Sequence, residues 1–207
     1  MIGALVHNRK GASAAEFALV LPLLLLLMFG IIDAARFLWE TNRAEKATQV
    51  GARVAVVTDA IPGGLVAQRY VGNTAGGTAL TQGDLIPRAA LGEIRCVSTS
   101  GTMSCTCEVS PCPATLTPYV TTGHALMLTR MRNIKPDIAE QNVRVSYRGS
   151  GLGYAGDPNG MEIAPLVTVE LTGLQFTPVT TLLLATITLP NFRTTLTAED
   201  SAGIQSN

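Results

Sequence analysis

The stretch that decides the fold is Ala12–Ile32, ASAAEFALVLPLLLLLMFGII, in which Glu16 is the one charged residue. As an α-helix, this stretch extends over about 31 Å at roughly 1.5 Å per residue, which is enough to cross the hydrocarbon core of a bilayer. Arg9 and Lys10 come immediately before it, and positive charge beside a membrane span favours retention of that end in the cytoplasm. The sequence therefore predicts a single-pass membrane protein with a short cytoplasmic N-terminus and an exported remainder.

The residues before the apolar run differ from those of a secretory signal peptide. Such a signal keeps its apolar region uncharged and has a small-residue cleavage site after that region. Here Gly11 precedes the apolar run, so cleavage after Gly11 would leave the helix attached to the protein. Glu16 is costly in lipid, by roughly 2.5–3.5 kcal/mol at the bilayer centre and less near the interface. Two interpretations are open: Glu16 reaches the cytoplasmic interface beside Arg9 and Lys10, or it has a function within the membrane.

These motifs resemble those of a known family. Gly11, followed after four residues by Glu16 and Phe17, resembles the prepilin-peptidase site of tight-adherence (Flp-type) pilins, which have Tyr where this chain has Phe17. The longer runs AEFALVLP at 15–22 and FGIIDAAR at 29–36 are similar to those of the TadE-like minor pilins, or pseudopilins. The resemblance is strong over residues 9–57 and weaker in the C-terminal strands.

The resemblance implies both processing and partners. A prepilin peptidase would remove residues 1–11 as a leader by cleaving between Gly11 and Ala12. Glu16 would then be the fifth residue of the mature chain and would pair with the N-terminal ammonium of a neighbouring subunit. Because each of these charges is expensive in lipid, pairing them between subunits would remove that cost. The implied partners of the N-terminal helix are other pilin subunits and the pilus assembly platform. The implied location is the bacterial inner membrane with a periplasmic C-terminal domain, or the extracellular pilus.

The helix is predicted to continue to Val57, with a transmembrane half at 12–38 and an amphipathic half at 39–57. At 100° per residue, small and apolar residues form one narrow stripe and polar residues lie opposite. The stripe contains Phe37, Ala44, Ala47, Gly51, Val54 and Ala55, and the opposite face contains Asn42, Glu45, Lys46, Gln49 and Arg53. We expect the stripe to pack on the protein's own sheet, with neighbouring subunits as the alternative. Pro22 either kinks or loosens the lipid half, or is an incidental transmembrane proline.

The four cysteines, Cys96, Cys105, Cys107 and Cys112, lie in one stretch of the exported domain at 58–207. In an oxidising compartment, an even number of cysteines predicts disulfides. If Ser100-Gly101 is a hairpin turn, Cys96 faces Cys105 and leaves Cys107 with Cys112. The pairing 96–107 with 105–112 is the alternative, and a bond between Cys105 and Cys107 has poor geometry. The spacing matches no zinc-ligand pattern.

The rest of the exported domain predicts an α+β fold, in which an antiparallel sheet with a free edge lies on the long helix. Residues 58–84 predict a surface loop containing at most one short helix or strand. A helix is expected over about 123–133 with Thr122 as its cap, and Gly149–Gly160 predicts an exposed turn region. Alternation predicts strands containing Val143, Val145 and Tyr147, then Val167, Val169 and Leu171. Leu182–Leu189 is too short for a second span, and 192–198 is expected to be the closing strand.

Nothing in the sequence predicts an enzyme, a cofactor or a metal site. We expect His124 at the surface and Asp33, Asp137, Asp157 and Glu162 to be solvated. The formal net charge is zero, and no basic run follows the N-terminus, so nucleic-acid binding is not expected. Two hypotheses remain. The first is a minor pilin that takes part in the initiation or tip of a tight-adherence type IV pilus used in surface attachment. The second is a permanently membrane-anchored envelope module that binds a partner through its disulfide-stapled loop.

Overall fold

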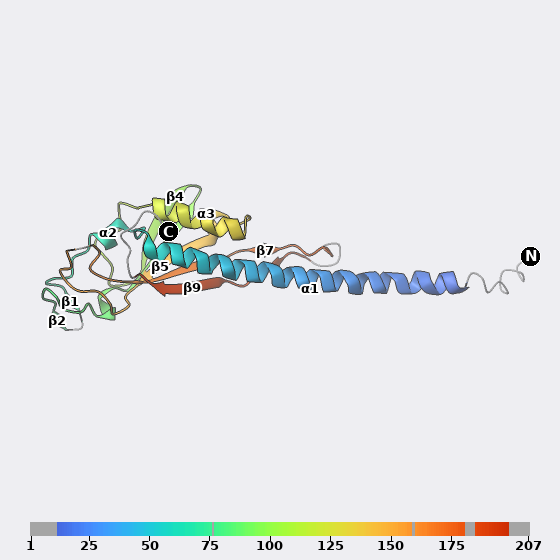
Figure 1. Cartoon of the computed structure of the whole chain (residues 1–207), viewed down its shortest axis with the longest axis horizontal. Coiled ribbons are helices and arrows are strands. Elements are labelled where there is room, and N and C mark those ends of the chain that lie inside the picture. The colour runs from blue at the N-terminus through green and yellow to red at the C-terminus, as the bar shows by residue number, and fades with distance from the viewer. Residues whose placement is uncertain (1–11, 76, 159, 181–184, 199–207) are drawn as a thin grey trace, which may run out of the picture. The chain divides into compact units, whose positions relative to one another are not determined.

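The structure, a computed structural model, describes residues 12–75, 77–158, 160–180 and 185–198 of the chain (Figure 1). Helix α1 is continuous over Ala12–Val57 and contains Pro22. The predicted continuation of the apolar helix to Val57 is therefore confirmed. The leader, Gly11 and part of the Leu182–Leu189 segment lie outside the described residues.

By their internal contacts the residues form two compact units. The first unit contains the helix up to Thr41 together with Gln175–Thr188, and the second contains Asn42–Leu174 and the chain from Leu189 onward. Within the first unit, β7 (Gln175–Phe176) and β8 (Ile187–Thr188) pair in antiparallel register. A segment late in the sequence therefore belongs with the first half of the helix.

The second unit contains a five-stranded antiparallel sheet of strand order β4-β3-β5-β6-β9. Its strands are β3 (Glu93–Thr99), β4 (Thr102–Val109), β5 (Val143–Arg148), β6 (Leu166–Leu171) and β9 (Phe192–Thr197). The other elements are α2 (Gly63–Val66), β1 (Thr74–Ala75), β2 (Thr78–Ala79), η1 (Arg88–Ala90), α3 (Thr122–Ile134) and η2 (Glu140–Asn142). The predicted α+β class and antiparallel sheet are confirmed, with β4 and β9 at the edges.

The core lies between this sheet and the two helices that cover it. The alternating residues of β5 and β6 predicted to face inward are all buried: Val143, Val145, Tyr147, Val167, Val169 and Leu171. On α1, the small stripe residues Ala44, Ala47, Gly51, Val54 and Ala55 are buried, whereas the predicted polar face is exposed. A Cβ on Gly51 would lie 2.6 Å from Met131 Sδ of α3 and 3.2 Å from Val169 Cγ1 of β6. The stripe therefore packs on the protein's own sheet, as predicted, and also on α3.

A two-residue turn at Ser100-Gly101 joins β3 and β4. Both residues have positive φ, 51° for Ser100 and 78° for Gly101. Positive φ at both central positions gives the twist of a tight antiparallel hairpin. The turn fixes the register in which Cys96 lies opposite Cys105.

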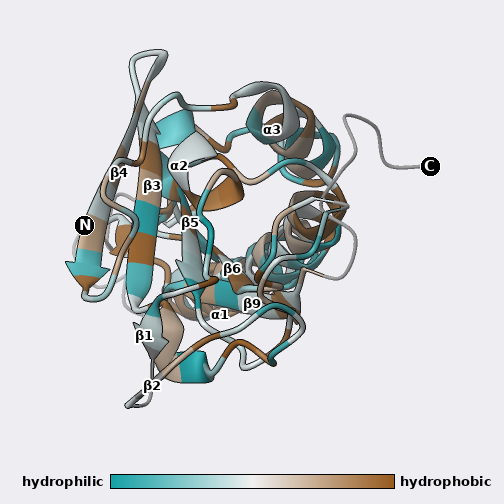
Figure 2. Ribbon diagram, turned by 90° about the vertical axis from the view of Figure 1, so that its left-hand side faces the viewer, coloured by the Kyte–Doolittle hydropathy of each residue, from teal (hydrophilic) through white to brown (hydrophobic). Residues whose placement is uncertain are grey.

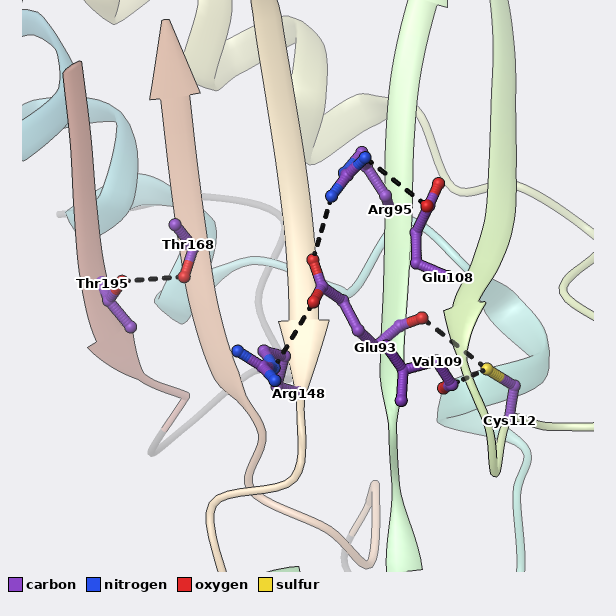
Figure 3. A network of polar contacts seen from close by, with 8 residues as sticks. All are labelled: Glu93, Arg95, Glu108, Val109, Cys112, Arg148, Thr168 and Thr195. Carbon is purple, nitrogen blue, oxygen red and sulfur yellow. Dashed lines mark hydrogen bonds and ion pairs between the residues drawn. The ribbon is translucent and has the colours of Figure 1, made fainter. Parts of the chain in front are cut away.

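The other face of the sheet is polar. The carboxylate of Glu93 of β3 forms ion pairs with Arg95 at 3.3 Å and with Arg148 of β5 at 3.5 Å (Figure 3). Arg95 forms a second ion pair with Glu108 of β4 at 3.5 Å. Farther across the sheet, the hydroxyls of Thr168 and Thr195 lie 2.8 Å apart. In Figure 2, brown and teal segments alternate along β3, as expected for a strand with one apolar and one polar face.

Residues 58–84 are more structured than the predicted loop, since they contain α2 and the small β1–β2 ladder. Gly63 N–H donates to Pro118 O at 2.8 Å, and a Cβ on Gly64 would collide with Thr115 O. The Pro-Gly-Gly sequence thus permits close contact between two backbones rather than only a turn. The prediction that Thr122 caps α3 is wrong, because the cap position is Thr121, whose side chain makes no capping hydrogen bond.

Candidate membrane-anchoring and assembly site

The N-terminal part of α1 presents an apolar surface with no covering element among the described residues. No charged residue occurs between Glu16 and Asp33, and the residues of the most apolar window are all unburied. By length and composition, this helix can cross a membrane. Apart from the half-buried Phe29, the large apolar side chains from Phe17 to Ile32 are exposed, which is the arrangement lipid would stabilise.

Three of the four residues predicted for processing and assembly lie in the described part of α1. Gly11 lies outside the described residues, and Ala12 is the first residue of α1. Glu16 and Phe17 are both exposed near the start of the helix, and Phe17 is 66% exposed. Glu16 is thus available to a partner outside the chain, and its pairing with another subunit stays a prediction.

Asp33 makes the densest polar contact in the first unit. Its carboxylate accepts hydrogen bonds from the backbone N–H groups of Val179 at 2.6 Å and Thr180 at 3.0 Å. It also accepts one from Thr180 Oγ1 at 2.7 Å, and Arg36 lies 3.5 Å away. The prediction that Asp33 is solvated is wrong, since it is only 6% exposed. Hydrogen bonds to an ionised acceptor are stronger than neutral ones, so Asp33 ties residues 179–180 to the helix.

An aromatic contact continues this attachment along the helix. Phe37 and Phe176 of β7 meet edge to face with ring centroids 5.5 Å apart. The Arg36 guanidinium lies 5.5 Å from the Phe176 ring centroid, and its NH1 donates to Thr177 O at 3.5 Å. We call this set of contacts, made by Asp33, Arg36 and Phe37 to residues 176–180, the Asp33 clamp. The charge of Asp33 was visible in the sequence, but nothing in the sequence pointed to its partners.

The four cysteines form two disulfides, Cys96–Cys105 and Cys107–Cys112. The preferred pairing is therefore confirmed over the alternative. The first bond joins directly opposite residues of β3 and β4 and is buried, whereas Cys107 is exposed and Cys112 is half-buried. The second bond closes the segment that follows β4, and Gly92 N–H donates to Pro111 O within that segment at 2.7 Å.

His124 is buried at 8% exposure, so its predicted surface position is wrong. It lines a small pocket with Thr58, Asp59 and Tyr147, between the end of α1, α3 and β5. Burial lowers the pKa of His124, with Glu140 opposing that shift and Arg132 adding to it. In turn, Ser98 Oγ donates to Glu140 at 2.6 Å, and this hydrogen bond is the main reason why the pKa of Glu140 is lowered. These contacts make His124 part of the core of the second unit.

Glu162 is also buried, at 2% exposure, and the prediction that it is solvated is wrong. Its carboxylate accepts hydrogen bonds from Tyr70 N–H at 2.8 Å and Arg69 NH1 at 3.3 Å. Burial and the nearby Glu162 charge raise the pKa of Tyr70. Asp137, in contrast, is exposed as predicted and pairs with the buried Lys135 at 2.9 Å. Among the described residues, no cluster of three or more His, Cys, Asp or Glu could hold a metal ion.

Residues 11–53 match the family model described as TadE-like protein. The N-terminal segment is therefore similar to that of TadE-like proteins. The TadE-like segment includes Glu16, Pro22, Asp33 and Gly51 and ends inside α1, so the expected resemblance of this helix is confirmed. The sheet lies outside the matched residues, and its predicted weaker resemblance stays a prediction. Searches of curated proteins and of solved structures found no match.

Proposed function

We propose that this protein is a minor pilin that takes part in the assembly of a tight-adherence type IV pilus, at its initiation or its tip. In this proposal a prepilin peptidase cleaves between Gly11 and Ala12 on the cytoplasmic side of the membrane. The sheet-containing unit is then periplasmic before assembly and extracellular in the pilus. The TadE-like match at residues 11–53 is the observation that carries the proposal.

Two features of the helix support a role in assembly rather than in simple anchoring. The exposed Glu16 lies five residues after the proposed cut and has an uncharged apolar run after it. A carboxylate in that position requires a partner, and the new ammonium of a neighbouring subunit would supply one. The stripe of small residues packs within the chain itself, so the first half of α1 supplies the apolar helix surface that remains for contact between subunits.

The mature N-terminus tests the proposal directly. We expect intact mass and the terminal peptide to show a chain that begins at Ala12 in cells with the prepilin peptidase and at the leader in cells without it. Gly11→Val should block the cut, because a side chain at the cleavage position would enter the peptidase site. Gly3→Val, a matched change within the leader, should be cleaved normally.

A chain that keeps its leader in the presence of the peptidase, or a cut after Ala34, would contradict the pilin proposal. That result would favour the second hypothesis, a permanently anchored envelope module with Cys107–Cys112 stapling a partner-binding loop. Recovery of the protein with sheared filaments separates the two as well, since a permanently anchored module stays with the membrane.

A further inference from the structure

The hairpin of β7 and β8 runs along α1 toward the apolar end of the helix. Phe176 lies beside Phe37, Thr177 O accepts from Arg36, and Val179 and Thr180 donate to Asp33. As the chain advances from 176 to 180, its contacts thus move back along α1 from residue 37 to residue 33. Asp33 is the first charged residue after the apolar run, so residues 179–180 lie level with the end of that run.

The length of the run sets the depth of these residues in a bilayer. The uncharged residues 17–32 account for about 24 Å of a hydrocarbon core of about 30 Å, so the edge of the core falls within a few ångströms of Asp33. Leu38 and Trp39 follow by about 8–9 Å along the helix axis, within or at the outer edge of the headgroup layer. Tryptophan is enriched at this depth because its ring is apolar and its N–H requires a polar partner.

Four exposed apolar side chains lie between the level of Asp33 and the level of Trp39. Leu38 is 61% and Trp39 64% exposed, on helix faces turned away from the hairpin. Val179 is 53% and Ile187 43% exposed on the hairpin itself. Ile187 pairs with Phe176 and therefore lies level with Phe37. We call Leu38, Trp39, Val179 and Ile187 the apolar collar.

We propose that the apolar collar is a lipid-binding surface that lies at the membrane–water interface on the side away from the N-terminus. In this proposal the Asp33 clamp holds Val179 and Ile187, the two collar residues of the hairpin, in place. Two observations carry this inference. The collar is continuous with the exposed apolar surface of the helix, and the carboxylate at its level is satisfied by three hydrogen bonds and Arg36, as a charge at the edge of lipid must be. The inference rests on the membrane-held helix of the proposed function and does not depend on cleavage at Gly11.

Trp39 is the one tryptophan of the chain, so its fluorescence reports on the collar without any substitution. The full chain is placed in vesicles of phosphatidylcholine and phosphatidylglycerol, in which part of the phosphatidylcholine is brominated either near the glycerol end or near the middle of its acyl chains. We expect the shallow bromines to quench Trp39 about twofold more strongly than the deep ones, because the ring lies near the headgroups. Iodide in the surrounding buffer should quench Trp39 weakly.

Single-tryptophan variants extend the test to the hairpin. With Trp39→Phe as background, Val179→Trp should be quenched by the shallow lipid, Leu25→Trp by the deep lipid, and Val109→Trp on the exported sheet by iodide alone. Adding Asp33→Ala to the Val179→Trp chain should reduce its quenching by lipid and increase its quenching by iodide. Glu45→Ala, which removes an exposed carboxylate from the same helix, should change neither.

Each outcome decides the matter. If Leu25→Trp is quenched by lipid while Trp39 and Val179→Trp behave like Val109→Trp, lipid binding by the collar is contradicted, whereas the membrane-held helix is supported. If Leu25→Trp is not quenched by lipid, both are overturned. Protection of Trp39 from iodide in detergent that increases with protein concentration would show that a second copy, and not lipid, covers the collar.

Discussion

Protonation of His124 is opposed by its surroundings. The folded protein favours the neutral imidazole because burial lowers the pKa of His124 below its ordinary value of 6.5. The unfolded chain therefore binds more protons than the folded one near that pH, and stability increases with pH in this range. The stabilisation that neutral His124 provides is fully present above its unfolded pKa and is lost as the pH falls through its lower folded pKa.

We predict that the urea midpoint of the full chain in detergent falls when the pH is lowered from about 8 to about 5, and that His124→Leu removes most of this dependence. Glu140 contributes in a lower window, because its pKa is depressed from 4.5 by its hydrogen bond from Ser98, so its stabilisation is lost only at more acidic pH. A His124→Leu chain with the wild-type pH dependence between these values would contradict the assignment. Urea unfolding followed by circular dichroism measures the midpoints of the wild-type and His124→Leu chains at each pH.

The burial of the Asp33 and Glu162 carboxylates could not be predicted from the sequence. Asp33 was expected to be solvated from its place along the chain, yet it accepts hydrogen bonds from backbone N–H groups 146 and 147 residues away. Glu162 likewise accepts from Tyr70, which is 92 residues distant. A carboxylate whose partners are backbone N–H groups leaves no pattern of residue types, because every residue except proline has that group. Burial of such a charge follows from topology and not from local composition.

At Gly51, α1 lies close to two other elements, α3 and β6. We predict that Gly51→Leu lowers the free energy of unfolding by about 3 kcal/mol, because its side chain must displace Met131 and Val169. The matched control is Gly30→Leu in the lipid half of the same helix, where a Cβ meets nothing within 4 Å. Equal urea midpoints for the two variants would show that α1 does not pack on the sheet through Gly51.

The two disulfides are expected to differ in what they stabilise. Cross-linking loops of this size restricts the unfolded chain by roughly 2–3 kcal/mol in the chain-entropy account. Cys96–Cys105 is in addition buried in the core, so replacing both residues with Ala should cost more stability than replacing Cys107 and Cys112. Loss of the second bond should instead appear as faster proteolysis within residues 107–118, measured by mass spectrometry of the fragments. The reverse order of effects would contradict this division.

The elements that could be predicted are those with a local cause. The α1 stripe, the alternating strands β5 and β6 and the Ser100-Gly101 turn each follow from the spacing of residues within a few turns or pairs. The predicted turn set the strand register, and this register made Cys96–Cys105 the preferred pair. The β7–β8 hairpin and its attachment to α1 had no such signal, because two-residue strands carry almost no periodicity. The same is true of the cap of α3, where Thr121 and Thr122 are adjacent and equally suited.

For the assembled pilus, Glu16 is the residue whose replacement should separate processing from assembly. We predict that Glu16→Gln is still cleaved after Gly11 and still held in the membrane, where loss of the charge lowers the cost of burial in lipid. Its recovery in sheared filaments should be largely lost, since no carboxylate remains to pair with the neighbouring ammonium. Glu45→Gln on the exposed face of α1 is the control and should be recovered normally. Wild-type recovery of the Glu16→Gln chain would contradict the pairing.

At the level of the whole chain, the family resemblance could be recognised from the sequence more readily than the tertiary contacts. The apolar run, its flanking charges and the Gly-Glu-Phe spacing lie within about the first fifth of the chain, and the family match at residues 11–53 covers all of these except Arg9 and Lys10. The five-stranded sheet contributes no comparable motif. Its architecture followed from alternation, but its buried charges and its division from the hairpin at 175–188 became visible only in three dimensions.

The hydrogen bond between the hydroxyls of Thr48 of α1 and Thr194 of β9 joins residues 146 positions apart, and in the topology proposed above it has a consequence for export. A chain that crosses the membrane from its N-terminal anchor delivers the helical stripe first and the closing edge strand last. The β3–β4 hairpin can form, and its disulfide can be oxidised, as soon as residues 93–109 have emerged. The sheet beneath the helix cannot be completed until nearly the whole chain has crossed, so the small apolar stripe stays open to chaperones and proteases throughout translocation. Termination of synthesis before Phe192 would leave an anchored chain with an oxidised hairpin and an unfinished core.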